Sequence, residues 1–388
     1  MSNTADVIII GGGVQGASLA FHLSRRGTKV IVLEKQFVAA GATGRSSGLV
    51  RMHYDTEVDS RFAWVSFQYF RNWKELVGGN TNCGFTRTGF LQIVGSKHVE
   101  ALKVNVKMHQ QIGIPSLVVT ADDVKRICPH LATDDIEVAA YEPESGYAMP
   151  SDTAAALMTV ARENGTRLVQ DCTVTGIQVT GGKVTGVETS QGLFSAPVVV
   201  NAAGPWANSI NKMVGFDLPL TTWRHDTMFV VRPPEVGPSH PAVIDFGHEM
   251  YFRPEGPLTL VGLEDGNPLG ESPDTDTDHA QKGFVERAID RICLRMPVME
   301  KGALHSAHGG YDGITPDQHP VLGAAGPDGF YLDCGHSGTG FKTAPAVGLC
   351  MSELILDGAS KTVNISSLTP MRFADGRPIK GNYENIWR

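Results

Sequence analysis

The sequence predicts an α/β protein that combines a buried, parallel sheet near the N-terminus with a second, β-rich region. Residues 6–35 contain an apolar run, a glycine-rich turn, a helical pattern and another apolar run, which is the order of a βαβ unit. Residues 217–263 instead alternate apolar and polar side chains in short segments, as antiparallel strands do. The 388-residue chain is long enough for two packed domains.

The first three elements are a strand, a helix and a strand. Residues 6–10 (DVIII) form the kind of apolar run expected of a strand buried on both faces. Residues 17–26 have helical spacing, and Gly27 is placed to end that helix. Residues 29–33 (KVIVL) predict a second buried strand beside the first.

Further helices and strands follow along the chain. Apolar spacing predicts helices over 57–76, 97–111, 121–128, 151–164, 276–294 and 341–356. Strand patterns occur at 88–94, in short segments over 166–200 with a Gly-Gly turn at 181–182, and in segments within 217–263. Ser151 or Asp152 is the expected cap of the helix over 151–164.

Charge and cysteine content exclude several classes of protein. A net charge of −8 argues against nucleic acid or an anionic membrane as the main partner. The six cysteines lack metal-ligand spacing, and we expect reduced thiols. No apolar run reaches about 18 residues, so we expect a cytoplasmic protein without a membrane span. His305 and His308 have no accompanying carboxylate or cysteine, and we expect no metal site.

The first glycine turn predicts a dinucleotide site of the Rossmann type. Gly11 permits a tight turn, Gly13 lets the backbone approach a pyrophosphate, and Gly16 allows close helix–strand packing. Glu34 ends the second strand, where it can accept from a ribose hydroxyl; an acid there disfavours NADP and leaves NAD and FAD open. The cofactor-binding residues expected in this unit are Gly11, Gly13, Val14, Gly16, Glu34 and Lys35.

Two later motifs favour FAD. They are "VVVNAAGPWAN" (198–208) and "GITPDQHPVLG…GFYLDCGHSGTGFKTAPAVG" (313–348). With the opening motif, they make the chain resemble the FAD-dependent D-amino acid oxidase/sarcosine oxidase (DAO) superfamily, in its sarcosine/glycine oxidase-like branch, over nearly its whole length. The resemblance implies a Rossmann-like FAD-binding domain of the GR2 type with an inserted antiparallel-β substrate-binding domain. The expected ranges are 1–80, 145–215 and 320–388 for the FAD-binding domain, and 81–144 and 216–319 for the substrate-binding domain.

One FAD molecule accounts for both glycine loops. The first loop would bind the pyrophosphate and adenosine, while residues 335–345 would approach the isoalloxazine ring. The helix that follows points its positive end at the ring edge where charge gathers on reduction. The remaining cofactor-binding residues that we expect are Thr43, Ser46, Val174, Ala203, Gly204, Gly338, Thr339, Gly340, Phe341 and Lys342.

The resemblance also implies that FAD is bound non-covalently. Some relatives attach it through a cysteine, but Gly310 stands at the matching position. Others carry a second flavin on a histidine, where this chain has Ser151.

Arg51 and Lys342 match the pair that binds the substrate carboxylate in the sarcosine oxidase branch. Each charge-assisted hydrogen bond to a carboxylate contributes on the order of 1.5–3 kcal/mol. Tyr251 matches a substrate-contacting tyrosine of the family. Three more residues fall in stretches that lie near the cavity in relatives: His225, Arg224 and Tyr311.

The expected reaction is oxidation of a carboxylate-bearing amine, such as sarcosine or another N-substituted glycine. Hydride passes to flavin N5, and the resulting imine is hydrolysed. The stretch 256–265 lacks the lysine that promotes reaction with oxygen in monomeric sarcosine oxidases, so oxygen and another electron acceptor both remain open. The alternatives are a 2-hydroxy acid or glycerol 3-phosphate dehydrogenase, or a flavoprotein subunit of a larger complex; an oligomer is possible.

Overall fold

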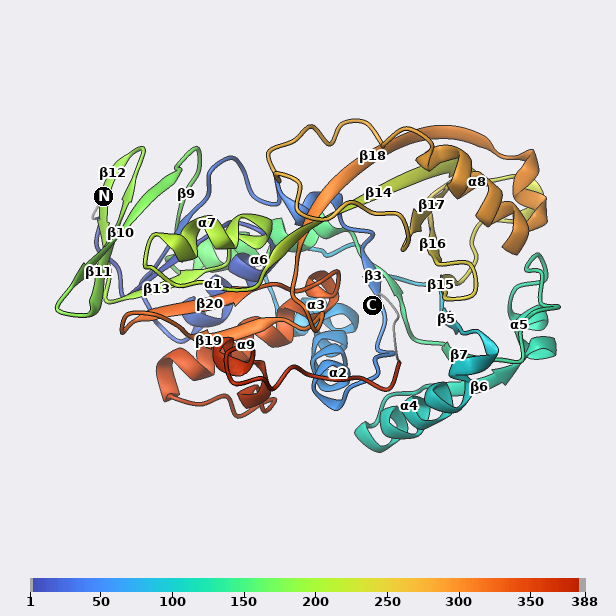
Figure 1. Cartoon of the computed structure of the whole chain (residues 1–388), viewed down its shortest axis with the longest axis horizontal. Helices are drawn as coiled ribbons and strands as arrows, with labels where there is room; N and C mark the ends of the chain where they lie inside the picture. Colours follow the sequence, from blue (N-terminus) through green and yellow to red (C-terminus); the bar gives the residue numbers. More distant parts are fainter. Residues whose placement is uncertain (1–2, 384–388) are drawn as a thin grey trace.

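The structure, a computed structural model, describes residues 3–383 and has one large β-sheet in each half of its long axis (Figure 1). One sheet is six-stranded and the other eight-stranded. Two three-stranded sheets accompany them: β10 (Val174–Thr180), β11 (Lys183–Thr189) and β12 (Gly192–Ser195), and β3 (Leu49–Val50), β8 (Gly146–Tyr147) and β4 (Thr86–Arg87).

The six-stranded sheet has the order β19-β20-β13-β1-β2-β9 and is parallel except for β19. Its strands are β1 (Val7–Ile10), β2 (Val30–Leu33), β9 (Arg167–Val169), β13 (Val198–Asn201), β19 (Val321–Ala324) and β20 (Phe330–Cys334). Alternate residues of β1 enter different cores, with Val7 and Ile9 on one face and Ile8 and Ile10 on the other. This burial on both faces explains why the strand is apolar at every position.

Helices cover one face of this sheet, and the β10–β12 sheet covers the other. The helical face carries α1 (Val14–Arg25), α2 (Glu57–Arg71), α6 (Pro150–Glu163) and α9 (Gly340–Asp357). The opposite core contains Val184, Val187 and Phe194 of β11 and β12, together with α7 (Ala207–Lys212). The predicted α/β class and the βαβ unit at the N-terminus are confirmed.

The eight-stranded sheet has the order β18-β14-β17-β16-β15-β5-β7-β6. Its strands are β5 (Phe90–Ile93), β6 (Leu117–Thr120), β7 (Val138–Glu142), β14 (Thr221–Val231), β15 (Ala242–Asp245), β16 (Met250–Glu255), β17 (Leu258–Leu263) and β18 (Ala303–Ile314). It is bordered by α4 (Val99–Ile112), α5 (Ala121–Ile127) and α8 (Phe284–Arg295). The sheet is antiparallel, as expected, except where β15 pairs in parallel with β5. This parallel pair joins two separate segments of the chain, since β5 and β15 are far apart in the sequence.

The strands of the two large sheets are drawn from different segments of the chain. Those of the six-stranded sheet fall in the ranges predicted for the FAD-binding domain, and those of the eight-stranded sheet fall in the ranges predicted for the substrate-binding domain. The exact domain limits stay a prediction. Residues 1–2 and 384–388 of the first domain lie outside the described residues.

Three predicted helices differ from those observed. The helix expected over 276–294 begins only at Phe284, because Gly283 before it is left-handed (φ +82°) and cannot continue a helix. The expected helix over 57–76 divides at Asn72, whose backbone is not helical, into α2 and α3 (Trp73–Leu76). Met149, not Ser151 or Asp152, is the N-cap of α6, since Pro150 fits the first helical position, where no N–H partner is needed.

Within residues 3–383, no helix combines the length and the hydropathy that crossing a bilayer requires. All six cysteines are free thiols in the structure.

Candidate active site

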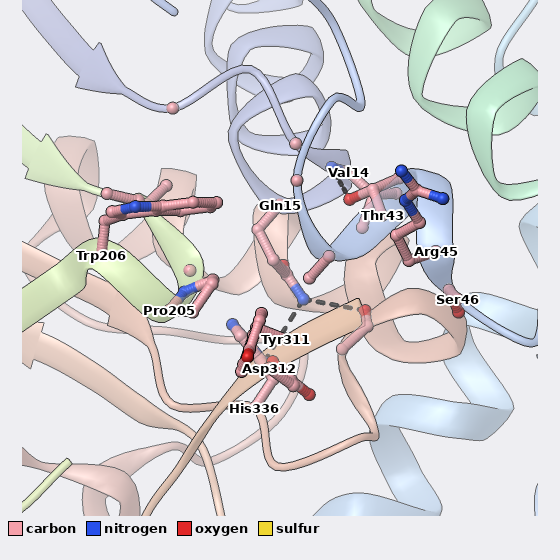
Figure 2. A pocket seen from close by; sticks show the side chains of 18 of the residues that line it. Val14, Gln15, Thr43, Arg45, Ser46, Pro205, Trp206, Tyr311, Asp312 and His336 are labelled. Atoms are coloured by element: carbon pink, nitrogen blue, oxygen red, sulfur yellow. Dashed lines mark hydrogen bonds between the residues drawn. The ribbon is translucent and has the colours of Figure 1, made fainter. Parts of the chain in front are cut away.

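A cavity of about 460 Å³ connects the two large sheets. It extends from residues that follow β1, β2 and β13 to residues of β14, β16 and β18. The carboxyl ends of parallel strands are the usual ligand site of an open α/β sheet. Figure 2 shows Pro205 and Trp206 on one side of the cavity and Thr43, Arg45 and Ser46 on the other.

The first glycine loop brings backbone amides to this cavity. Gly11 is left-handed (φ +111°), and a Cβ there would lie 2.5 Å from the carbonyl oxygen of Ala202. Gly13 caps α1 without a side-chain hydrogen bond, and the Val14 N–H donates to Thr43 Oγ1 at 3.0 Å. Gly16 is outside the lining, and a Cβ there would overlap the Gly11 carbonyl. Its role is the close packing predicted for the third glycine.

Glu34 is oriented by the backbone at the end of β2. Its Oε2 accepts from the Gly12 N–H at 2.7 Å, and its Oε1 accepts from the Gln36 N–H at 2.8 Å. Lys35 also lines the cavity, but its ammonium pairs with Asp274 at 2.8 Å and lies 3.8 Å from the centre of the Trp206 ring. The Glu34 carboxylate, held in place by two backbone N–H groups, suits a ribose hydroxyl.

The two glycine loops, at opposite ends of the sequence, meet in space. Gln15 of α1 donates through Nε2 to the Gly340 carbonyl at 2.9 Å and lies 3.3 Å from His336 Nδ1 (Figure 2). Ser18, one turn further along α1, donates to the Ala344 carbonyl of α9 at 2.7 Å. One ligand can therefore contact both loops.

Most of the predicted cofactor residues line the cavity. Besides those already placed, the lining includes Ser46, Val174, Ala203, Gly204, Gly338, Gly340, Phe341 and Lys342. Thr339 is outside the lining, because its hydroxyl donates to the His336 carbonyl at 2.6 Å. The lining residues that the sequence prediction missed include Gln15, Trp206, Asp312 and His336. Three of these four, Gln15, Trp206 and His336, lie inside the quoted motifs, in which the prediction relied on the glycines.

Arg51 and Lys342 are two buried cations in the same cavity. Arg51 directly follows β3 and is 5% exposed; it donates to the His53 carbonyl, while its Nε has no hydrogen-bond partner. Lys342 lies in the first turn of α9, is 7% exposed and donates to the Gly338 carbonyl at 3.0 Å. Burial, with the nearby charge of Arg51, lowers the pKa of Lys342 to about 7. Within the part of the chain that the structure describes, neither cation has a salt bridge to a carboxylate.

Tyr251 and His225, the other predicted catalytic residues, also line the cavity. The Tyr251 ring packs directly on Gly262, where any Cβ would overlap it. Burial lowers the pKa of His225 to about 3, so the imidazole is neutral, and both of its nitrogens lack hydrogen-bond partners. The structure thus brings all four predicted catalytic side chains to one cavity.

Glu264, directly after β17, is a further cavity residue that the sequence prediction missed. Burial raises the pKa of its carboxyl to about 7, and its Oε2 has no hydrogen-bond partner. The sequence prediction for residues 256–265 concerned only the absence of a lysine. An acid that ends an apolar strand is the signal that could have found it.

The two weaker candidates have different positions. Tyr311 lines the cavity, and its hydroxyl donates to Glu271 at 2.6 Å. Arg224 is not among the lining residues; it pairs with Asp226 at 2.9 Å and lies 3.3 Å from the Tyr311 hydroxyl. Arg224 therefore stabilises the wall through Tyr311.

The expectation of no metal site stays a prediction. His305 and His308 of β18 contact hydroxyl groups, those of Ser306 at 3.0 Å and Thr227 at 3.4 Å. Another group, His53, His109 and Glu142, could offer atoms within 4.8 Å of one another. The positive charge of Arg51 acts on all three of these side chains and opposes a cation among them.

The residues of the cavity suit FAD. Backbone N–H groups at the start of α1 fit the pyrophosphate, Glu34 fits the ribose, and the loop before α9 lines the same cavity. At Gly310, a Cβ would lie 2.6 Å from Arg45 Cβ, so the position of the covalent cysteine in some relatives has no room for a side chain here.

Comparisons with known proteins agree with this fit. The family model described as "FAD dependent oxidoreductase" (DAO) matches residues 6–354. Mitochondrial sarcosine dehydrogenase of Homo sapiens is 28% identical over 374 residues, covering 92% of this chain but 40% of that protein. Sarcosine oxidase subunit beta of Arthrobacter sp is 27% identical, covering 96% of this chain and 92% of the subunit.

Solved structures share the whole fold. The L-proline dehydrogenase from P. horikoshii superposes with a TM-score of 0.90 at 27% identity, covering 98% of this chain and 100% of that one. The glycine oxidase from Geobacillus kaustophilus has a TM-score of 0.84 at 24% identity, over 95% and 99% of the two chains. With two glycine loops at one cavity and a family match over most of its length, the chain belongs to the DAO family of FAD-dependent oxidoreductases, and its cofactor is FAD.

Proposed function

We propose that the protein oxidises a small amine that carries a carboxylate, such as sarcosine, another N-substituted glycine or a related amino acid. The product is the imine, which water then hydrolyses. The observation that carries this proposal is the pair of buried cations, Arg51 and Lys342, beside the loop that precedes α9.

Neither of these buried cations has a carboxylate within salt-bridge distance among the described residues, although the carboxyls of Glu264 and Asp312 act on Lys342 from further away. Each loses hydration, and each repels the other, as the lowered pKa of Lys342 records. A substrate carboxylate offers two oxygens, enough to accept from both the guanidinium and the ammonium. This charge balance supports the predicted roles of Arg51 and Lys342 as the carboxylate clamp.

The other cavity residues would orient the substrate and exclude water. When bound, FAD supplies the oxidant, accepting two electrons and the hydrogen from the carbon next to the nitrogen. Neutral His225 and the Tyr251 hydroxyl offer hydrogen-bonding groups without adding a third cation. Arg51 and Lys342 would hold the substrate in one orientation, which makes the hydrogen transfer effectively intramolecular.

The relatives support an amine rather than another carboxylate compound. Sarcosine and L-proline, in the names of the relatives described above, are both secondary amines with a carboxylate on the adjacent carbon. The chain spans 40% of the length of mitochondrial sarcosine dehydrogenase, so the activity of that whole enzyme is carried over here only as a proposal.

Anaerobic absorption spectra of the purified flavoprotein test this function. Sarcosine, L-proline, glycine and iminodiacetate are added in turn, followed by 2-hydroxy acids and glycerol 3-phosphate. Bleaching of the flavin band by an amine is the expected result. Bleaching by hydroxy compounds alone would overturn it. Admitting air afterwards shows whether oxygen is the electron acceptor.

A second candidate is a flavoprotein subunit of a larger dehydrogenase. It is favoured by the near full-length match to a protein named as a subunit, sarcosine oxidase subunit beta. Its sign would be bound flavin that none of these compounds reduces until another chain is added.

A further inference from the structure

Glu264 is a buried carboxyl group for which the carboxylate clamp has no use. It lies directly after β17, lines the cavity and has an Oε2 that is buried without a hydrogen-bond partner. An unpaired buried carboxylate oxygen costs free energy unless a ligand donates to it. The cavity therefore contains an acceptor whose donor is missing from the described residues.

Charged and polar groups reach Glu264 from several elements. Arg51 follows β3, Lys342 belongs to α9, and the charges of both lower the pKa of Glu264. Tyr251 of β16 and His225 of β14 line the same cavity. Asp265, the next residue, faces away and pairs with Arg291 at 2.6 Å and Arg287 at 3.5 Å.

A bound carboxylate would change the partners of Glu264. Before substrate binds, Arg51 and Lys342 provide its only opposing charges among the groups that act on its pKa. Once those cations donate to the substrate, Glu264 is left as a carboxyl group without a partner of its own. A substrate that carries an ammonium group beside its carboxylate supplies the missing donor.

We propose that Glu264 binds the amino nitrogen of the substrate and takes one of its protons. This proposal rests on the proposed function. The preferred substrates are then amino acids that arrive as zwitterions, with the carboxylate on Arg51 and Lys342 and the ammonium on Glu264.

Proton transfer to Glu264 precedes the oxidation. An N–H bond of the ammonium breaks and an O–H bond forms on Glu264, which leaves a lone pair on nitrogen. The C–H bond beside the nitrogen then breaks, its electron pair leaves with the hydrogen to FAD as oxidant, and the lone pair forms the C=N bond. Without the first step, no lone pair is available to form that bond.

Sarcosine and methylthioacetate form a matched pair of ligands for the test. They differ only in having N–H₂⁺ or sulfur at the same position. We expect Glu264→Gln to weaken sarcosine binding by about tenfold or more, the value of one charge-assisted hydrogen bond. Methylthioacetate binding should be unchanged or tighter, because a negative charge near its carboxylate is removed. Perturbation of the flavin spectrum measures methylthioacetate binding, and the saturation of anaerobic flavin reduction measures sarcosine binding.

Two further variants separate a chemical role from a structural one. Asp265→Asn removes the same charge one residue away, outside the cavity, and should leave both affinities unchanged. Glu264→Asp keeps the carboxylate and should therefore bind sarcosine more tightly than Glu264→Gln does. The flavin spectrum and the melting temperature of each variant verify that it is folded and loaded.

The pH profile provides a second readout. Since Glu264 must be ionised to accept a proton, kcat/KM for sarcosine should fall as the pH decreases through the titration of Glu264. Glu264→Gln should abolish that limb.

Equal effects of Glu264→Gln on both ligands, or no effect on sarcosine, would overturn the proposal. Failure of the proposed function is a different result, because there the unaltered protein would not be reduced by any amine.

Discussion

Arg51 is the residue on which substrate affinity should depend most directly. Its guanidinium is buried and lines the same cavity as Lys342, and its Nε has no hydrogen-bond partner among the described residues. We expect Arg51→Ala to weaken methylthioacetate binding by about 10–100-fold, through the loss of one charge-assisted hydrogen bond. Titration of the flavin spectrum measures the affinity. Arg61→Ala, which removes an exposed cation paired with Glu57, is the control and should change nothing. An unchanged affinity in Arg51→Ala with FAD still bound would refute the clamp.

Lys342 makes carboxylate binding dependent on pH. Its pKa is lowered to about 7 by burial and by Arg51, so the free protein loses this positive charge as the pH rises above that value. A carboxylate binds the protonated lysine, and its affinity should therefore fall by up to about tenfold per pH unit above pH 7. Below pH 7 the affinity should be constant.

Because Glu264 titrates in the same range, the measurement is made with Glu264→Gln present in every sample. The Glu264 carboxylate raises the pKa of Lys342, so without it the fall in affinity should begin below pH 7. Methylthioacetate is titrated from about pH 6 to about pH 9. Adding Lys342→Met should weaken binding at low pH and remove most of the slope. A slope that survives this substitution would assign the titration to another group.

At the scale of elements, the contact between α1 and α9 holds the two glycine loops together. Gly348 of α9 has no side chain where the helices meet, and a Cβ there would overlap Ser18 Oγ and lie 2.7 Å from the Ser18 backbone carbon. Gly348→Ala must separate the helices, and the hydrogen bonds of Gln15 and Ser18 to α9 depend on their spacing.

We expect Gly348→Ala to lower stability by about 1–3 kcal/mol, the usual cost of overpacking, and to reduce bound FAD. Urea unfolding and the flavin content of the purified protein measure the two effects. Gly95→Ala is a matched control, because a Cβ at Gly95 meets nothing within 4 Å and the backbone is not left-handed. Equal stability and flavin content in both variants would show that the helix contact does not determine cofactor binding.

At the scale of the whole molecule, FAD should stabilise the fold. The cavity lies between the two large sheets, and its walls come from both. A ligand that binds only the folded protein stabilises it by about 2.7 kcal/mol at 100 times its Kd. The melting temperature should therefore fall when FAD is removed and return with added FAD. NAD should have no such effect, and equal stabilisation by NAD would contradict the assignment of one FAD to both loops.

Much of the fold could be predicted from local pattern. Apolar runs at β1 and β2 report burial on both faces, and Gly11 and Gly13 report a backbone that must turn tightly and approach a ligand. The helix limits at Gly283 and Asn72 were less accurate, because the start of a helix depends on the backbone angles of one or two residues. The long strand β18 was not predicted, since its register is set by pairing with β14 rather than by its own composition.

The sequence by itself determined the α/β class and the cofactor and predicted the two cations, because each depends on residue types at short spacing or on motifs that can be recognised in the sequence. Only the tertiary structure decided which side chains share a cavity. Arg51, Glu264 and Lys342 are far apart along the chain, and their proximity depends on how β3, β17 and α9 are packed. Burial then changes the chemistry of these groups, since a carboxyl or an ammonium acquires a shifted pKa only when neighbours from distant segments exclude water.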